Sequence, residues 1–285
     1  QNNRYQRAGI IEKKGGVTRE IIIYILHKRA QSTCFRGGSE MTNNILEYIY
    51  KKKYADKKFH ESNHVRNILI HFLEWRKIKE SKDYQILTKQ EKDKMRLEYD
   101  CDAYYYKSVV GLSEEESLRG DTMISFWTPY RLAIYKMTGW SFSKTVNSLK
   151  LLIKKIDSDE AGYLEVNKIF EDFAKICYTK GNFMLLPDRK MNTKRGEICE
   201  DRMDETLYQC FKGGALSNYF KNDDDVLCKW VDEQKLNLLF KDNIINRDNI
   251  IPFNKPTQFT PFYMSLDKIY RYVDRAVEII NERNK

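Results

Sequence analysis

Apolar residues recur at helical spacing along most of the chain, and this pattern limits the fold more than any other feature. Residues three and four apart share one face of an α-helix, so each such stretch predicts a helix with one apolar face. In the second part of the chain the pattern covers residues 124–137, 145–156, 164–178, 205–211, 226–240 and 264–281. All of these stretches fit helices better than strands, and we predict a mostly α-helical protein.

Composition agrees with a folded, globular protein. The chain has 285 residues, of which 41% are hydrophobic and 13% aromatic, enough for one large domain or two ordinary ones. The apolar run at residues 21–26 is far too short to span a bilayer, so we expect no membrane partner. The six cysteines are widely spaced and form no C-x-x-C motif, which predicts reduced thiols and a cytoplasmic location.

The positive charge is concentrated in the first third of the chain. Residues 1–100 hold 22 Lys and Arg against 13 Asp and Glu, whereas residues 101–285 hold 28 of each. Such asymmetry is typical of a nucleic-acid-binding module joined to a neutral domain, although a solubilising basic face is an alternative. We therefore predict a basic domain over residues 1–100 and a helical domain over residues 101–285.

The basic domain has a recognisable order of predicted elements. Helices are predicted over residues 18–30 and 39–53, and a third helix begins after the N-cap residue Ser62. Its apolar stripe consists of Val65, Ile68, Leu69, Phe72 and Leu73. Residues 78–80 and 84–87 predict a short β-hairpin, and the capping box from Thr88 to Glu91 predicts a further helix.

This order, carried by residues 65–69, 75–78 and 84–88, resembles the winged helix-turn-helix family of DNA-binding proteins. One departure is that residues 54–61 are longer than the usual turn. The resemblance implies that Asn63, Arg66, Asn67 and His71 face the major groove of duplex DNA. It also implies phosphate contacts from the lysines of this region, Lys51, Lys52, Lys53, Lys57, Lys58, Lys79 and Lys82. Ordinary solvated charges are the alternative interpretation of these residues.

The same third helix has a competing interpretation. Its residues 66–71 match the Arg-Asn-x-x-x-His motif of HEPN-type ribonucleases, which are helical proteins of bacterial toxins and antiviral systems. That resemblance implies RNA as the partner, acid–base chemistry at His71 and stabilisation of phosphate charge by Arg66.

The second domain resembles an uncharacterised family of bacterial proteins. The resemblance rests on residues 118–123, 181–183 with Pro187, 195–196 and 279–284, and it implies a bacterial or phage source without an activity. An irregular loop is predicted over residues 179–200. This loop and a neighbouring segment provide a candidate ligand pocket that contains Arg119, Asp121, Asn182, Asn192 and Arg195. Alternatively, the glycines of this region serve turns, the asparagines cap helices and Arg119 forms an ion pair.

No common cofactor or metal motif is present. The sequence lacks a Walker loop, G-x-G-x-x-G, G-x-S-x-G and H-E-x-x-H, so we expect no cofactor. The acidic residues 223–225 are explained more simply as a capped helix start than as a metal site. We therefore expect a DNA-binding protein of bacterial or phage origin, by default a symmetric homodimer, whose second domain has a sensing, assembly or effector role. A ribonuclease toxin or defence nuclease and a protein-interaction module remain the alternatives.

Overall fold

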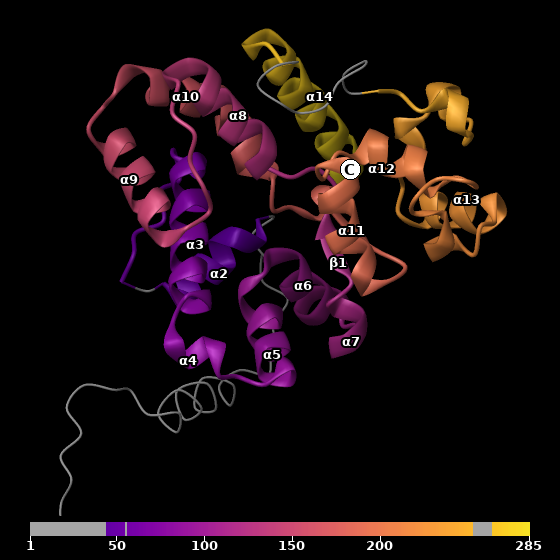
Figure 1. Cartoon of the computed structure of the whole chain (residues 1–285), viewed down its shortest axis with the longest axis horizontal. Helices are drawn as coiled ribbons and strands as arrows, with labels where there is room; N and C mark the ends of the chain where they lie inside the picture. Colours follow the sequence, from indigo (N-terminus) through magenta and orange to yellow (C-terminus); the bar gives the residue numbers. More distant parts are fainter. Residues whose placement is uncertain (1–43, 55, 253–263) are drawn as a thin grey trace, which may run out of the picture. The chain divides into compact units, whose positions relative to one another are not determined.

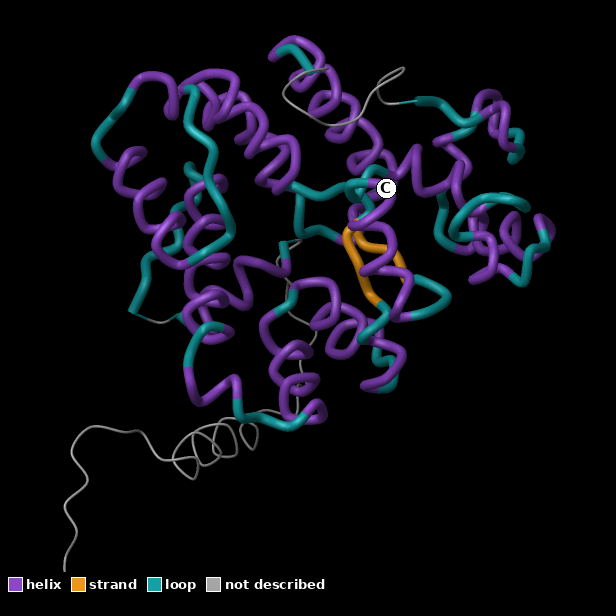
Figure 2. The backbone as a smooth tube through the Cα atoms, viewed as in Figure 1, coloured by secondary structure: helices purple, strands orange, loops and turns teal. Residues whose placement is uncertain are grey.

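The computed structural model describes residues 44–54, 56–252 and 264–285 (Figures 1 and 2). Within them the prediction of a mostly helical protein is confirmed, because the described residues form thirteen α-helices and one two-stranded sheet. The helix predicted over residues 18–30 lies outside the described residues. The described residues belong to one compact unit, and the predicted boundary at residue 100 falls inside that unit.

The elements follow one another closely along the chain. The first helices are α2 (Ile45–Lys53), α3 (His64–Lys79), α4 (Lys82–Gln85), α5 (Lys89–Tyr99), α6 (Cys101–Tyr105), α7 (Glu114–Ser117) and α8 (Trp127–Thr138). The later ones are α9 (Val146–Asp157), α10 (Ala161–Ile176), α11 (Arg189–Cys199), α12 (Met203–Cys210), α13 (Asp224–Glu233) and α14 (Leu266–Asn284). A π-helical turn, Tyr106–Val110, continues α6, and the strands are β1 (Gly120–Thr122) and β2 (Phe183–Leu185). The 3-10 turns are Lys180–Asn182, Ser217–Phe220, Asn237–Leu239, Lys241–Asn243 and Arg247–Asn249.

Helix α3 begins close to the predicted start of the third helix and packs against both α9 and α10 (Figure 1). Asn63 caps its first turn, because the Asn63 side chain accepts a hydrogen bond from the Arg66 amide at 3.0 Å. The predicted apolar stripe is largely buried, with Val65, Ile68 and Leu69 fully shielded from solvent. The same core continues from α2 to α14, so α3 belongs to the interior of the unit.

The predicted wing is wrong. Residues 64–79 form a single helix, and residues 82–85 form the short helix α4 where strands were expected. The physical cause is a second helix start that the sequence analysis missed, because the Ser81 side chain accepts a hydrogen bond from the Tyr84 amide at 3.1 Å and caps α4. Lysine, glutamate and glutamine around this cap favour helix over strand.

Most helices after residue 100 confirm the periodicity of the sequence. Helices α8, α9, α10, α12 and α14 lie within a few residues of the predicted stretches. The helix predicted over residues 226–240 ends early, since α13 stops at Glu233 and a 3-10 turn covers residues 237–239. The loop expected over residues 179–200 is irregular only in part, because β2 and the eleven residues of α11 lie within it.

Strands β1 and β2 join segments about sixty residues apart into an antiparallel pair in which Asp121 faces Met184 (Figure 2). Asn182 fixes this junction. Its side-chain oxygen accepts from the Ile124 amide at 3.0 Å, and its side-chain nitrogen donates to the Ile124 and Cys177 carbonyl oxygens at 3.0 and 2.8 Å. The sheet thereby sets the position of the chain on both sides of Asp121.

Two further observations concern the described residues alone. None of their helices combines the length and the apolar character needed to cross a membrane. Their five cysteines, Cys101, Cys177, Cys199, Cys210 and Cys228, form no disulfide with one another.

Candidate functional site

The residues expected to read DNA bases do not form an outward face. Asn67 and His71 are 0% and 3% exposed, which contradicts the prediction that both are presented on the helix surface. Asn67 instead fixes the preceding loop, because its amide group exchanges hydrogen bonds of 3.0 and 2.7 Å with the backbone of His60. The Arg66 guanidinium donates to both carboxylate oxygens of Asp157 at 3.0 and 3.2 Å. The amphipathic pattern identified the helix, but His60, Tyr54 and Asp157 of α9 contact Asn67, His71 and Arg66 on the face that was expected to meet DNA.

Several of the lysines expected at phosphates have partners inside the protein. Lys51, Lys53 and Lys57 form ion pairs with Glu47, Glu98 and Asp56 respectively. The Lys52 ammonium lies over the rings of Tyr48 and Tyr104, 5.6 and 5.9 Å from their centroids. Lys58 and Lys82 are exposed. Lys79 differs from all of these, because it lines two adjoining pockets.

The ligand pocket expected around Arg119 assembles only in part. Asp121 and Asn192 line one pocket, whereas Asn182 is the buried clamp of the sheet and the Arg119 Nε donates to the Leu186 carbonyl at 2.7 Å. Arg195 is completely buried and forms an ion pair with Asp121. Its guanidinium also donates to the Met123 carbonyl at 3.3 Å and to the Thr206 hydroxyl at 3.2 Å. Arg195 therefore holds the β1 segment in place.

Four carboxyl groups line the pocket that contains Asp121, which we call the aspartate pocket. It has a volume of about 430 Å³. Its ionisable lining comes from α3, α5, α6, β1 and four connecting segments. These residues are His71, Lys79, Arg96, Asp100, Cys101, Asp102, Asp121, Lys144, Cys177, Tyr178 and Asp201. This mixture of acids and bases in one cavity is typical of sites that bind polar ligands or transfer protons.

Two of the four carboxyl groups have arginine partners. The Arg96 Nε donates to Asp100 at 2.8 Å, and Arg195 is bound to Asp121. Asp102 and Asp201 have no ion pair within the described residues. The Asp102 side chain accepts only a local hydrogen bond, from the Ala103 amide at 2.7 Å. Asp102 and Asp201 are therefore the carboxyl groups of this pocket available to a ligand.

Burial shifts the protonation of several groups in the aspartate pocket. It raises the pKa of Asp102 to about 7, assisted by the nearby charge of Asp100. It also raises the pKa of Asp121 to about 6, although the Arg195 charge acts in the opposite direction. For the basic groups the effect is reversed, since burial lowers the pKa of His71 to about 4 and that of Lys144 to about 8. At neutral pH the site therefore holds a neutral imidazole and a carboxyl group near its midpoint.

Aromatic side chains form much of the remaining wall, comprising Phe72, Trp75, Phe126, Trp127 and Tyr178. The indole N–H groups of Trp75 and Trp127 are buried and have no hydrogen-bond partner among the described residues. Trp75 is 5% exposed and Trp127 is 2% exposed. Buried donors are rarely left unpaired, and both of these belong to residues that line the aspartate pocket.

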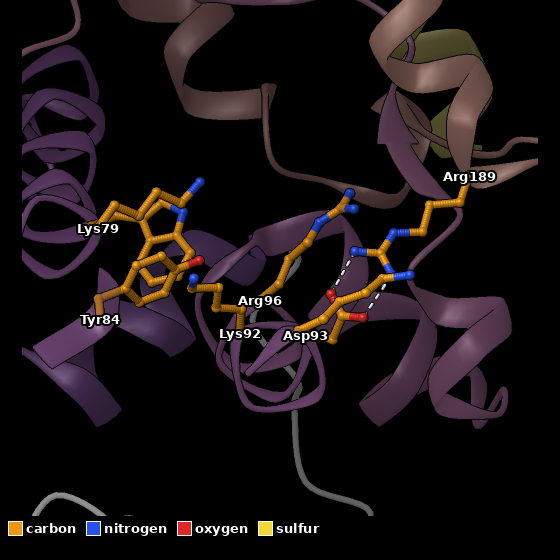
Figure 3. A pocket seen from close by; sticks show the side chains of 8 residues that line it. Lys79, Tyr84, Lys92, Asp93, Arg96 and Arg189 are labelled. Atoms are coloured by element: carbon orange, nitrogen blue, oxygen red, sulfur yellow. Dashed lines mark hydrogen bonds and ion pairs between the residues drawn. The ribbon is translucent and has the colours of Figure 1, made fainter. Parts of the chain in front are cut away.

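A second pocket adjoins the first and shares Trp75, Lys79 and Arg96 with it. We call it the lysine pocket. Its volume is about 350 Å³, and its other lining residues are Tyr84, Lys89, Lys92, Asp93 and Arg189. Figure 3 shows Lys79 and Tyr84 on one side, Asp93 and Arg189 on the other, and Arg96 between them. Five basic side chains thus surround a cavity with a single carboxylate.

The one carboxylate of the lysine pocket is already occupied. Arg189 donates to both oxygens of Asp93 at 2.8 and 2.5 Å, and these hydrogen bonds hold the pKa of Asp93 below its usual value (Figure 3). The Lys79 ammonium lies 4.6 Å from the centroid of the Trp75 ring, and the Lys92 ammonium lies 5.5 Å from that of the Tyr84 ring. Burial lowers the pKa of Lys79, which has no ion pair within the described residues. An anion bound here would favour the charged form of Lys79.

Sequence reasoning missed most of this site. Asp102, Lys144 and Asp201 belong to three separate segments and to no motif, so spacing alone gives no signal for them. Only the structure marks the turn that contains Asp201. Asp201 and Glu200 both have left-handed backbone angles, with φ of 57° and 52°, which non-glycine residues rarely adopt.

No group of three or more His, Cys, Asp or Glu side chains in the described part of the chain is arranged to hold a metal ion. Comparison with protein-family models, with curated proteins and with solved structures gives no match to this chain.

Proposed function

We propose that the protein binds a nucleotide across the two adjoining pockets, with the phosphate in the lysine pocket and the planar ring in the aspartate pocket. The observation that supports this most directly is the lining of the lysine pocket, where five basic side chains face one paired carboxylate. Both volumes fall in the range of about 300–1,000 Å³ typical of small-molecule sites.

The two pockets differ in the chemistry that they offer. Lysine and arginine side chains bind phosphate through charge-assisted hydrogen bonds, which are stronger than neutral ones. Aromatic walls bind the faces of nucleobases, whose stacking contributes about 1–3 kcal/mol per base. The shared residues Trp75, Lys79 and Arg96 connect the two environments, so one ligand with a charged and a planar end satisfies both.

The test is calorimetric titration of the full chain with AMP, ATP, adenosine and inorganic pyrophosphate. We expect AMP and ATP to bind more tightly than adenosine, which lacks phosphate, and than pyrophosphate, which lacks a ring. A 5′-phosphorylated single-stranded oligonucleotide is titrated in the same way, because its terminal nucleotide carries the same phosphate, pentose and base. Preference for the oligonucleotide would assign the pockets to a strand end, and preference for AMP or ATP would assign them to free nucleotides.

A pair of matched variants locates the site. The Lys89→Ala/Lys92→Ala double variant removes two cations from the lysine pocket, and we expect about a ten-fold loss of AMP affinity, equivalent to about 1.4 kcal/mol. Lys94→Ala is the control, since Lys94 is exposed on the same helix and lines neither pocket. Equal affinity for AMP and adenosine, or an equal loss in the control, contradicts the proposal.

Binding of duplex DNA and cleavage of RNA remain predictions from the sequence. The described residues form no wing, and they place Asn67 and His71 in the interior. Of the excess positive charge, residues 1–43 contribute eight Lys and Arg against three Asp and Glu. Anisotropy titrations of labelled duplex DNA over several salt concentrations test the DNA prediction separately, because binding through phosphates weakens steeply with salt.

A further inference from the structure

The aspartate pocket contains two carboxyl groups suited to proton transfer. Asp102, on α6, and Asp201, in the turn after α11, line the same cavity and form no ion pair within the described residues. The other two carboxyl groups, Asp100 and Asp121, are bound to arginines and serve to build the pocket. A pair of carboxyl groups with different environments is the arrangement by which glycoside-cleaving enzymes combine an acid with a base.

The two groups are in different electrostatic settings. Burial raises the pKa of Asp102 to about 7, so a large fraction of this group carries a proton at neutral pH. Asp201 interacts favourably with the charge of Lys144, whose ammonium lies 5.2 Å from the centroid of the Trp127 ring. Asp102 is therefore suited to donate a proton, and Asp201 is suited to accept one.

The position of the pocket limits which bond these groups reach. With the phosphate in the lysine pocket and the ring against the aromatic wall, the pentose lies at the residues shared by the two pockets, Trp75, Lys79 and Arg96. The bond between pentose and ring then lies inside the aspartate pocket. Carboxylates also stabilise the positive charge that develops on a pentose when this bond breaks.

We propose that the aspartate pocket hydrolyses the N-glycosidic bond of a bound nucleotide, with Asp102 as the proton donor and Asp201 as the proton acceptor. This inference rests on the proposed nucleotide binding and names the reaction that follows it. The C1′–N bond breaks, its electron pair stays with the ring nitrogen, and the proton of Asp102 passes to the departing base. A water oxygen bonds to C1′ and gives one proton to Asp201, so that the products are the free base and a pentose phosphate. Proton exchange with solvent restores both carboxyl groups.

The experiment incubates the full chain with AMP, GMP, CMP and UMP and measures the release of free base by reverse-phase chromatography. We expect release from at least one of these compounds. Asp102→Asn should lower the rate by a factor of about 100 or more, the size typical for loss of a general acid. Asp102→Glu should restore part of the rate, because it supplies a carboxyl group from a longer side chain. Asp201→Asn should also lower the rate, with AMP affinity within about two-fold of wild type in both asparagine variants.

The control is Asp172→Asn, since Asp172 is exposed on α10 and lines neither pocket. It should retain the wild-type rate. Nucleotide binding without release of base overturns this inference and leaves the proposed binding intact, whereas absence of binding overturns both. Release of inorganic phosphate in place of base overturns the inference, and so does an Asp102→Asn variant that works at the wild-type rate.

Discussion

The Nδ1 atom of His71 lies 3.0 Å from the hydroxyl oxygen of Tyr54, in the interior of the protein. Arg66, five residues earlier on α3, is bound to Asp157 of α9. Successive helical residues are about 100° apart, so side chains five positions apart point about 140° away from each other. The two residues of the ribonuclease motif therefore serve different places in this chain, and a ribonuclease role for them remains a prediction from the sequence.

The burial of His71 should make the protein sensitive to acid. Its pKa of about 4 is below the usual value of about 6.5, so this residue takes up a proton on unfolding when the pH lies between these values. The contribution of His71 to the free energy of unfolding should therefore fall as the pH drops through that window. In His71→Phe this contribution is absent, and the stability of the variant relative to wild type should rise by up to about 3 kcal/mol from pH 7 to pH 4. Urea denaturation at pH 7, 5.5 and 4.5 measures the difference, and parallel pH curves for the two proteins contradict it.

The ion pair of Arg66 with Asp157 should contribute modestly to the packing of α3 against α9. It has two hydrogen bonds, but the Asp157 side chain is 47% exposed, and solvent weakens such pairs. A double-mutant cycle of Arg66→Ala and Asp157→Ala should give a coupling energy of about 0.5–1 kcal/mol. The more exposed pair of Lys229 with Glu233, 3.9 Å apart, is the reference and should give a coupling near zero. Equal coupling in both pairs would show that the second hydrogen bond at Arg66 adds nothing.

The helices could be predicted from the sequence because each encodes its own apolar face. The stripe of Val65, Ile68 and Leu69 identifies α3 without knowledge of any neighbour. What this stripe cannot show is how much of the opposite face is covered as well. Asn67 looked like a base-reading residue because it is polar, but its amide satisfies the backbone of His60 in the interior. A buried polar side chain with good partners has the same sequence signature as an exposed one.

The candidate site was harder to predict because its residues meet only after folding. Asp121 and Asn192 were found from their place beside glycines and loops, and both line the aspartate pocket. Asp102, Lys144 and Asp201 come from segments with no motif between them, and only packing brings them together. The strand expected at residues 84–87 shows a similar limit at short range, since the cap at Ser81 outweighs a weak strand pattern.

The raised pKa of Asp102 should make the contribution of this residue to wild-type stability fall as the pH rises. A carboxyl group with a pKa of about 7 in the folded protein and about 4 in the unfolded chain keeps its proton in the fold across this range. Its contribution is fully present below pH 4 and is lost as the pH rises through 7. Asp102→Asn cannot ionise, so its stability relative to wild type should rise by at most about 4 kcal/mol from pH 4 to pH 8. Thermal or urea unfolding at these two pH values checks the sign, which is opposite to that expected for His71→Phe.

Gly181 should tolerate no side chain, because α14 passes directly over it. A Cβ atom at this position would overlap the carbonyl oxygen of Ile280 and lie 2.7 Å from the Asn284 Oδ1, which already accepts a hydrogen bond from the Gly181 amide. We expect Gly181→Ala to lower the free energy of unfolding by about 1–3 kcal/mol, because α14 must shift away from the 3-10 turn Lys180–Asn182. Gly196→Ala is the control within α11, since its Cβ would have Asp201 Oδ1 at 3.5 Å as its nearest neighbour. Alanine is the better helix former, so this variant should be more stable than wild type by about 0.5–1 kcal/mol.

Urea denaturation of both variants measures the two changes in the free energy of unfolding. Changes of opposite sign support the close approach of α14 to Gly181, whereas stabilisation by Gly181→Ala would show that the space beside α14 accommodates a methyl group.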